Sequence, residues 1–110
     1  MSEAGDTRAS YRPEGHVTFD NLIARRRDGE AFIASSGEHV VMDLSGLEDG
    51  NSAAVALLMA WYRKAELEGK ELEFRRAPAE LIKIIDLSGM TSVLPVRPSA
   101  EDAAAGEGAR

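Results

Sequence analysis

The sequence predicts an α/β domain in which helices lie against a β-sheet. Residues 39–44 form a compact apolar run, rich in β-branched residues and too short for a helix, which indicates a buried strand. Residues 52–67 follow with helical spacing, residues 71–74 alternate as a strand does, and another helical segment starts at Pro78. Because parallel strands require a crossover connection, this order places helices against the sheet.

Composition and charge narrow the classes of function. A chain of 110 residues with 44% apolar and 29% charged residues has the usual composition of one globular domain. Its net charge of -6 argues against nucleic acid or anionic lipid as a partner. The absence of cysteine excludes disulfides, thiol catalysis and cysteine-ligated zinc, and agrees with a cytoplasmic location. The longest apolar run, Ala53 to Tyr62, is too short to span a membrane, so membrane association would come through a partner.

The first part of the chain is predicted to be a flexible polar tail over residues 1–10, followed by one or two short strands between Tyr11 and Phe19. Residues 13–15, Pro-Glu-Gly, read as a turn. Period-two alternation places Val17 and Phe19 on the same side.

A helix is predicted next, with Asp20 as its N-cap. Its spacing turns Leu22, Ile23 and Phe32 toward the interior and leaves the arginines at 25–27 on the exposed side. The dipeptide Asp28-Gly29 is expected to end or weaken this helix.

The second helix is predicted over residues 52–67, with Ser52 as its N-cap and Gly69 as its C-terminal stop. A third helix follows Pro78 and ends at Gly89, with apolar residues at 81, 84 and 85. Residues 92–96 read as a short final strand, and residues 98–110, rich in alanine, glycine and acid, as a flexible tail.

No motif for catalysis, metal binding or cofactor binding is present in the sequence. Neither His16 nor His39 lies at metal-ligand spacing from a set of carboxylates, and no glycine-rich phosphate-binding loop occurs. The acid pair Glu48-Asp49 is the one feature that favours a small enzyme or nucleotide-binding module, and a solvated loop explains it as well. We therefore predict a protein that is not an enzyme.

Ser52 has two possible roles at the start of its helix. Its hydroxyl can cap the helix, or it can accept a phosphate, which the free amides and the helix dipole would favour. Both readings remain open at the level of the sequence.

The same helix has an unusually wide apolar surface. One stripe contains Val55, Leu58, Met59 and Tyr62, and an adjoining stripe contains Ala54, Leu57, Trp61 and Ala65. One reading is that part of this surface binds a protein partner, with Trp61 and Tyr62 as anchors. The other is that the helix is buried on two sides.

Several segments together resemble the STAS domain family. Residues 43–47, Asp-Leu-Ser-Gly-Leu, followed by residues 51–58, Asn-Ser-Ala-Ala-Val-Ala-Leu-Leu, resemble the Asp-Leu-Ser and Asp-Ser/Thr-x-Gly-Leu signature that anti-sigma factor antagonists share. Residues 15–20, 61–65, 71–81 and 88–95 are similar to successive segments of the MlaB branch, the STAS subunits of phospholipid-transport ABC systems. The resemblance implies a STAS domain over residues 11–97, with a mixed sheet flanked by helices.

The resemblance also implies a function and a site. A non-catalytic subunit of this kind binds the cytoplasmic ATPase of a Mla-type lipid transporter, which also contains a membrane permease, and lies at the inner membrane through that partner. The partner surface would comprise residues of the second helix and its start, namely Asn51, Ser52, Val55, Met59, Trp61 and Tyr62. The alternative is an anti-sigma factor antagonist switched by phosphorylation of Ser52. Asn51 replaces the usual carboxylate and Ala54 the usual glycine, which weakens that alternative.

Overall fold

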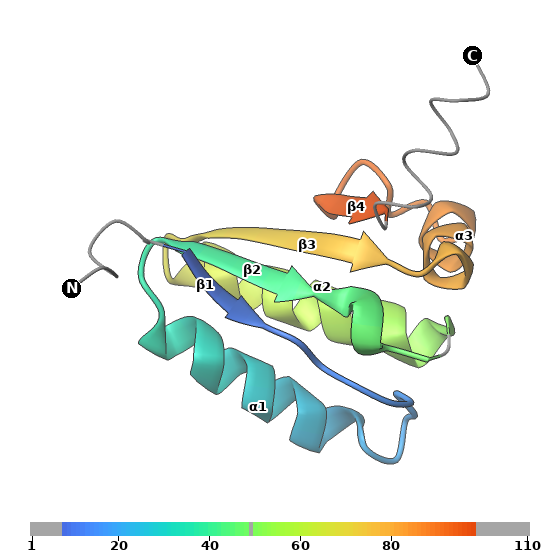
Figure 1. Cartoon of the computed structure of the whole chain (residues 1–110), viewed down its shortest axis with the longest axis horizontal. Coiled ribbons are helices and arrows are strands. Elements are labelled where there is room, and N and C mark those ends of the chain that lie inside the picture. Colours follow the sequence, from blue (N-terminus) through green and yellow to red (C-terminus); the bar gives the residue numbers. More distant parts are fainter. Residues whose placement is uncertain (1–7, 49, 99–110) are drawn as a thin grey trace.

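The computed structural model describes residues 8–48 and 50–98, which fold into one sheet and three helices. The elements follow in the order β1 (Arg8–Tyr11), α1 (Leu22–Ser35), β2 (His39–Asp43), α2 (Ser52–Leu67), β3 (Glu71–Ala77), α3 (Ala79–Leu87) and β4 (Val96–Pro98). The strands lie side by side in their sequence order. Figure 1 shows α2 running behind β2 and β3, opposite in direction to them, with α1 beside it. The predicted α/β class is confirmed.

The sheet is parallel at each of its three described pairings, whereas a mixed sheet was expected. The reason is that a helix lies in every connection between successive strands, so each crossover returns the chain in the same direction. Because the strand order also advances in one direction, right-handed crossovers place the helices on one face.

Alternate residues of the central strands face the helices. Val40 and Met42 of β2 and Leu72 and Phe74 of β3 are buried in the main apolar cluster, and α1, α2 and α3 contribute Ile33, Trp61 and Leu81. The opposite face carries Glu73 and Arg75, which form an ion pair with each other. The helix-facing side of the sheet is therefore the core.

The chain ends differ from the predicted boundaries. Arg8, Ala9 and Ser10 belong to β1, and Pro98 belongs to β4, so the sheet includes residues assigned to both tails. Residues 1–7 and 99–110 of those tails lie outside the described residues. The final strand is Val96–Pro98, a later segment than the predicted 92–96, because residues 91–93 form a turn after α3.

The segment between β1 and α1 contains no second strand. Gly15 makes a single parallel bridge to Leu47, and beyond it Val17 is buried while Phe19 is 68% exposed, so the two do not share a face. The N-cap position of α1 is Asn21, one residue after the predicted Asp20, and it makes no capping hydrogen bond. Its side-chain oxygen instead accepts from the backbone N–H of Thr18, 2.9 Å away.

Helix α1 continues through Gly29, where the sequence suggested an end. Gly29 is buried against the indole of Trp61, and a Cβ at position 29 would lie 2.1 Å from that ring. The indole N–H donates to the carbonyl oxygen of Arg26, 3.1 Å away. The glycine therefore serves the close packing of α1 on α2, which outweighs its weak helix propensity.

Candidate functional site

The loops at the carboxyl ends of β1 and β2 are joined by their backbones. The N–H of Gly15 donates to the carbonyl oxygen of Gly46 (2.9 Å), and the N–H of Glu48 donates to that of Gly15 (3.0 Å). A Cβ at Gly46 would lie 2.7 Å from the carbonyl oxygen of Pro13, and one at Gly50 would lie 2.6 Å from backbone atoms of Glu80. The loop that leads to α2 is therefore held between the segment after β1 and the start of α3.

Asn51, and not Ser52, is the N-cap of α2. Its side-chain oxygen accepts from the backbone N–H of Ala54, 2.9 Å away, and Ser52 is the first helical residue. The side-chain nitrogen of Asn51 donates to the carbonyl oxygen of Val17, 3.0 Å away. The prediction that Ser52 caps the helix is therefore wrong, because the preceding amide satisfies the free N–H and also ties α2 to the segment before α1.

Replacing Asn51 should therefore cost more stability than replacing Ser52. We expect Asn51→Ala to lower the free energy of unfolding by about 1–2 kcal/mol, because both the cap and the bond to Val17 are lost. Asn51→Asp keeps the cap acceptor but loses the donor, so it should cost about 1 kcal/mol. Ser52→Ala should change stability by less than about 0.5 kcal/mol. Urea unfolding of the three variants measures this order, and a larger loss in Ser52→Ala than in Asn51→Ala would contradict the assignment.

The predicted partner residues of α2 separate into exposed and buried ones. Ser52 and Met59 are exposed, and Asn51 and Tyr62 are half-buried. Val55 and Trp61 are buried within the core, so neither side chain can meet a partner in this structure. Trp61 is covered by α1, whose Gly29 packs against the indole, and Val55 belongs to the core cluster. The reading of a helix buried on two sides therefore fits these two residues.

Met59 and Tyr62 lie beside the turn that precedes β4. With Val93 and neighbouring residues they line a groove of about 330 Å³ between α2 and residues 92–94. Met59 is 42% and Val93 47% exposed. This groove is separated from Ser52 by about two turns of the helix, since an α-helix has 3.6 residues per turn.

Two exposed apolar side chains near the start of α1 were missed by the sequence reasoning. Phe19 and Ile23 are 68% and 58% exposed, although Ile23 was expected to face inward and Phe19 to share a side with Val17, which is buried. The segment that carries Phe19 is joined to the start of α2 by the bond from Asn51 to Val17. Phe19, Ile23 and Ser52 are exposed on the two segments that this bond joins, and we call these three residues the Ser52 surface. Helical spacing alone could not have identified it, because that spacing assigns Ile23, in the first turn of α1, to the inward side.

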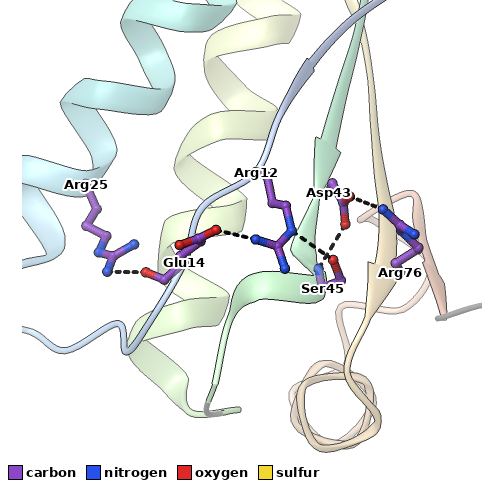
Figure 2. A network of polar contacts seen from close by, with 6 residues as sticks. All are labelled: Arg12, Glu14, Arg25, Asp43, Ser45 and Arg76. Atoms are coloured by element: carbon purple, nitrogen blue, oxygen red, sulfur yellow. Dashed lines mark hydrogen bonds and ion pairs between the residues drawn. The ribbon is translucent and has the colours of Figure 1, made fainter.

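Asp43 is the centre of a polar network at the end of β2, shown in Figure 2. Its carboxylate forms an ion pair with Arg76 and accepts from the backbone N–H of Ser45, 3.0 Å away. Arg76 has a φ of 58°, in the left-handed region, where the pairing of β3 with β4 is irregular. A bulge of this kind redirects a side chain, and here it turns Arg76 toward β2.

The charge of Asp43 is stabilised by its partners. Burial opposes ionisation, but hydrogen bonds from Arg76 and from the backbone and hydroxyl of Ser45 outweigh it, and the pKa falls from 3.8 to about 2. The pKa of Arg76 is raised by its hydrogen bond with Asp43, so both members stay charged at neutral pH.

The Asp43 pair should make stability depend on pH in the acid range. Because the folded-state pKa is lowered, its contribution is complete above about pH 4 and is lost as the pH falls from there toward 2. We expect Asp43→Asn to be less stable than wild type by about 1–2 kcal/mol at pH 7, a value reduced for the exposure of Arg76, and nearly equal at pH 2. Denaturant unfolding at pH 7, 4, 3 and 2 tests this, and a constant difference at all four values would contradict it.

Each of the two histidines lies within ion-pair distance of a glutamate. His16 lies 3.1 Å from Glu48, and His39 lies 3.0 Å from Glu71. Asp49, the other member of the acid pair, lies outside the described residues. Over residues 8–48 and 50–98, no group of three histidine or acidic side chains could hold a metal ion. The helices of this same part of the chain include none that is long and apolar enough to cross a membrane.

Comparison with known proteins places this arrangement in a family. A family model described as "Mlab, STAS domain" matches residues 14–95. None of the curated proteins compared matches the chain.

Solved structures share the fold at low sequence identity. An anti-sigma factor antagonist from Mycobacterium paratuberculosis is 24% identical, with a TM-score of 0.72 over 92% of this chain and 86% of that one. The STAS domain of a SulP transporter from Vibrio cholerae is 17% identical, with a TM-score of 0.67 over 92% and 83%. The anti-sigma factor antagonist SpoIIAA in its unphosphorylated form is 15% identical, with a TM-score of 0.64 over 87% and 84%.

Proposed function

Because this chain belongs to the MlaB family of STAS domains, we propose that it is a non-catalytic subunit that binds the cytoplasmic ATPase of a Mla-type lipid-transport ABC transporter. The ATPase hydrolyses ATP, a permease crosses the membrane, and this chain supports the assembly or activity of the complex. Its place at the inner membrane comes through the ATPase.

The observation that carries the proposal is the family match across most of the chain, and we assign the contact to the Ser52 surface. Phe19 and Ile23 expose large apolar side chains, and a surface of this kind favours a protein partner over solvent. The bond from Asn51 to Val17 and the close approach of Gly50 to Glu80 hold the start of α2 in place. A preformed surface loses little conformational entropy on binding.

Co-purification with the ATPase encoded by the same organism's lipid-transport operon tests the proposal. Wild type should bind, and Phe19→Asp and Ser52→Glu should each weaken binding about tenfold or more, because each places a charge in an apolar contact. Leu67→Asp is the matched control, since Leu67 is 79% exposed at the far end of α2 and should bind as wild type does. Absence of wild-type binding, or equal losses in all three variants, would refute the proposal.

A second candidate is an anti-sigma factor antagonist switched by phosphorylation of Ser52. The observation that favours it is the free Ser52 hydroxyl, which is exposed and is relieved of capping by Asn51. Incubation with an anti-sigma factor that has serine kinase activity, and with ATP, should then label wild type and leave Ser52→Ala unlabelled. A serine kinase gene next to the gene for this chain favours this candidate, and transporter genes favour the first.

A further inference from the structure

Ser45 occupies a fixed and exposed position beside the Asp43 network. It lies in a 3₁₀ turn, Leu44–Gly46, and its own backbone N–H donates to the carboxylate of Asp43. The next residue, Gly46, is confined by the carbonyl oxygen of Pro13. Ser45 borders an open hollow of about 500 Å³, which is lined by Arg12, Glu14, Gly15, Ser45, Gly46, Leu47 and Glu48.

The oxygen of Ser45 already contacts a cation. Nε of Arg12 donates to Oγ of Ser45 at 3.2 Å, and the same guanidinium pairs with Glu14, as Figure 2 shows. Arg12 is about half exposed and Glu14 two-thirds exposed, so this ion pair is weak and can be exchanged for a stronger one. A phosphate dianion is a better partner for a guanidinium than one exposed carboxylate is.

Ser52 differs from Ser45 in this respect. No side chain among the described residues forms a hydrogen bond with the Ser52 hydroxyl, and the first turn of α2 contains no arginine or lysine. A phosphate at Ser52 would meet the start of a helix whose first turn carries no basic side chain, whereas one at Ser45 would meet a guanidinium in contact with its bridging oxygen.

We propose that Ser45 is a phosphorylation site, distinct from Ser52, and that Arg12 holds the phosphate. In the transfer, Oγ of Ser45 forms a bond to the γ-phosphorus of ATP, and the bond from that phosphorus to the β–γ bridging oxygen breaks. ADP leaves, and the hydroxyl proton passes to the general base of a serine kinase, which is the class of enzyme required.

The phosphate changes the charge balance at the end of β2. It adds about −1.5 to −2 charges and draws Arg12 away from Glu14. The groups that face it are Arg12, Glu14, Glu48 with its partner His16, and Asp43 with its partner Arg76. Ser45 directly precedes Gly46 in the loop that leads to Ser52, and the carbonyl oxygen of Gly46 accepts from the N–H of Gly15. We expect the phosphate to shift this loop, a consequence that rests on the proposed function.

The role of Arg12 is tested by ³¹P NMR on the full chain with phosphoserine incorporated at position 45. Arg12 favours the dianion and lowers the phosphate pKa, while the carboxylates of Glu14, Glu48 and Asp43 raise it, so the informative quantity is the difference that Arg12 makes. We expect Arg12→Gln to raise the phosphate pKa by about half a unit or more. The chain with phosphoserine at position 52 is the control, and Arg12→Gln should leave its phosphate pKa unchanged. Identical titration with and without Arg12 at position 45 would overturn the proposal.

The occurrence of the modification is tested on the chain purified from its source organism. Phosphopeptide mapping by mass spectrometry should find phosphate on Ser45. In the Ser45→Ala variant, the phosphorylated form of that peptide should be absent. Phosphate on Ser52 alone, or on neither serine, would overturn the proposal. The result does not depend on whether the chain binds an ATPase, so failure here is distinguishable from failure of the proposed function.

Discussion

Replacing Trp61 with alanine is expected to lower the free energy of unfolding by about 3–5 kcal/mol. The indole is fully buried between α1 and the sheet, donates to the carbonyl oxygen of Arg26, and meets the ring of Tyr11 edge-on at 5.9 Å. Small domains are stable by about 5–15 kcal/mol, so this loss is a large share of the total. Urea unfolding followed by far-UV circular dichroism measures it.

The control separates a core residue from a partner contact. Trp61→Phe keeps most of the apolar volume and loses the N–H donor, so it should cost roughly 1–2 kcal/mol. Folded Trp61→Phe should bind the ATPase with wild-type affinity, because position 61 has no exposed surface. Weakened binding at unchanged stability would restore Trp61 as an interface anchor.

Gly29→Ala is expected to destabilise the protein by about 3 kcal/mol, opposite in sign to the effect of helix propensity. Alanine in the middle of a helix is favoured over glycine by about 1 kcal/mol. At position 29, however, the added Cβ would lie 2.1 Å from Trp61, which requires the two helices to move apart. Thermal and urea unfolding of the single variant give both the sign and the size.

A double variant shows whether the indole is the cause. Combining Gly29→Ala with Trp61→Phe removes part of the clash. The double variant should therefore lose less stability than the two single variants lose together. Ala31→Gly, at an exposed position of the same helix, is the matched control and should cost about 0.5–1 kcal/mol. A stabilised Gly29→Ala variant would contradict the close contact.

The main elements were predictable because their signals are local. The helix over residues 52–67 and the glycine stop at position 69 appear as predicted, and the strand predicted over 39–44 ends one residue earlier, at Asp43, because Leu44 begins a 3₁₀ turn. The order of strands and helices followed from the same patterns, and the fold confirms it. The family resemblance is confirmed by the family model. The helical crossovers indicated parallel strands, whereas the resemblance implied a mixed sheet. The described pairings are all parallel, because strand direction depends on the crossovers and not on the strand sequences.

The candidate site was only partly predictable. Ser52 is exposed, as a partner residue or phosphate acceptor must be, and Met59 is exposed as well. The N-cap of α2, however, was assigned one residue too late. Asn51 and Ser52 are both good capping residues, and nothing in their spacing decides between them. The decision comes from Val17, which accepts the second bond of the asparagine amide.

The amino-acid order alone thus determined one α/β domain, the extents of its central strand and its long helix, and the absence of known catalytic motifs, because periodicity and capping depend on residues within a few positions of one another. Contacts between residues about thirty positions apart decided four other features. These are the burial of Trp61, the place of Gly29 within a helix, the cap at Asn51 and the Asp43–Arg76 pair. Such contacts exist only once the crossovers have brought α1 onto α2 and β3 beside β2, and the tertiary structure therefore decided them.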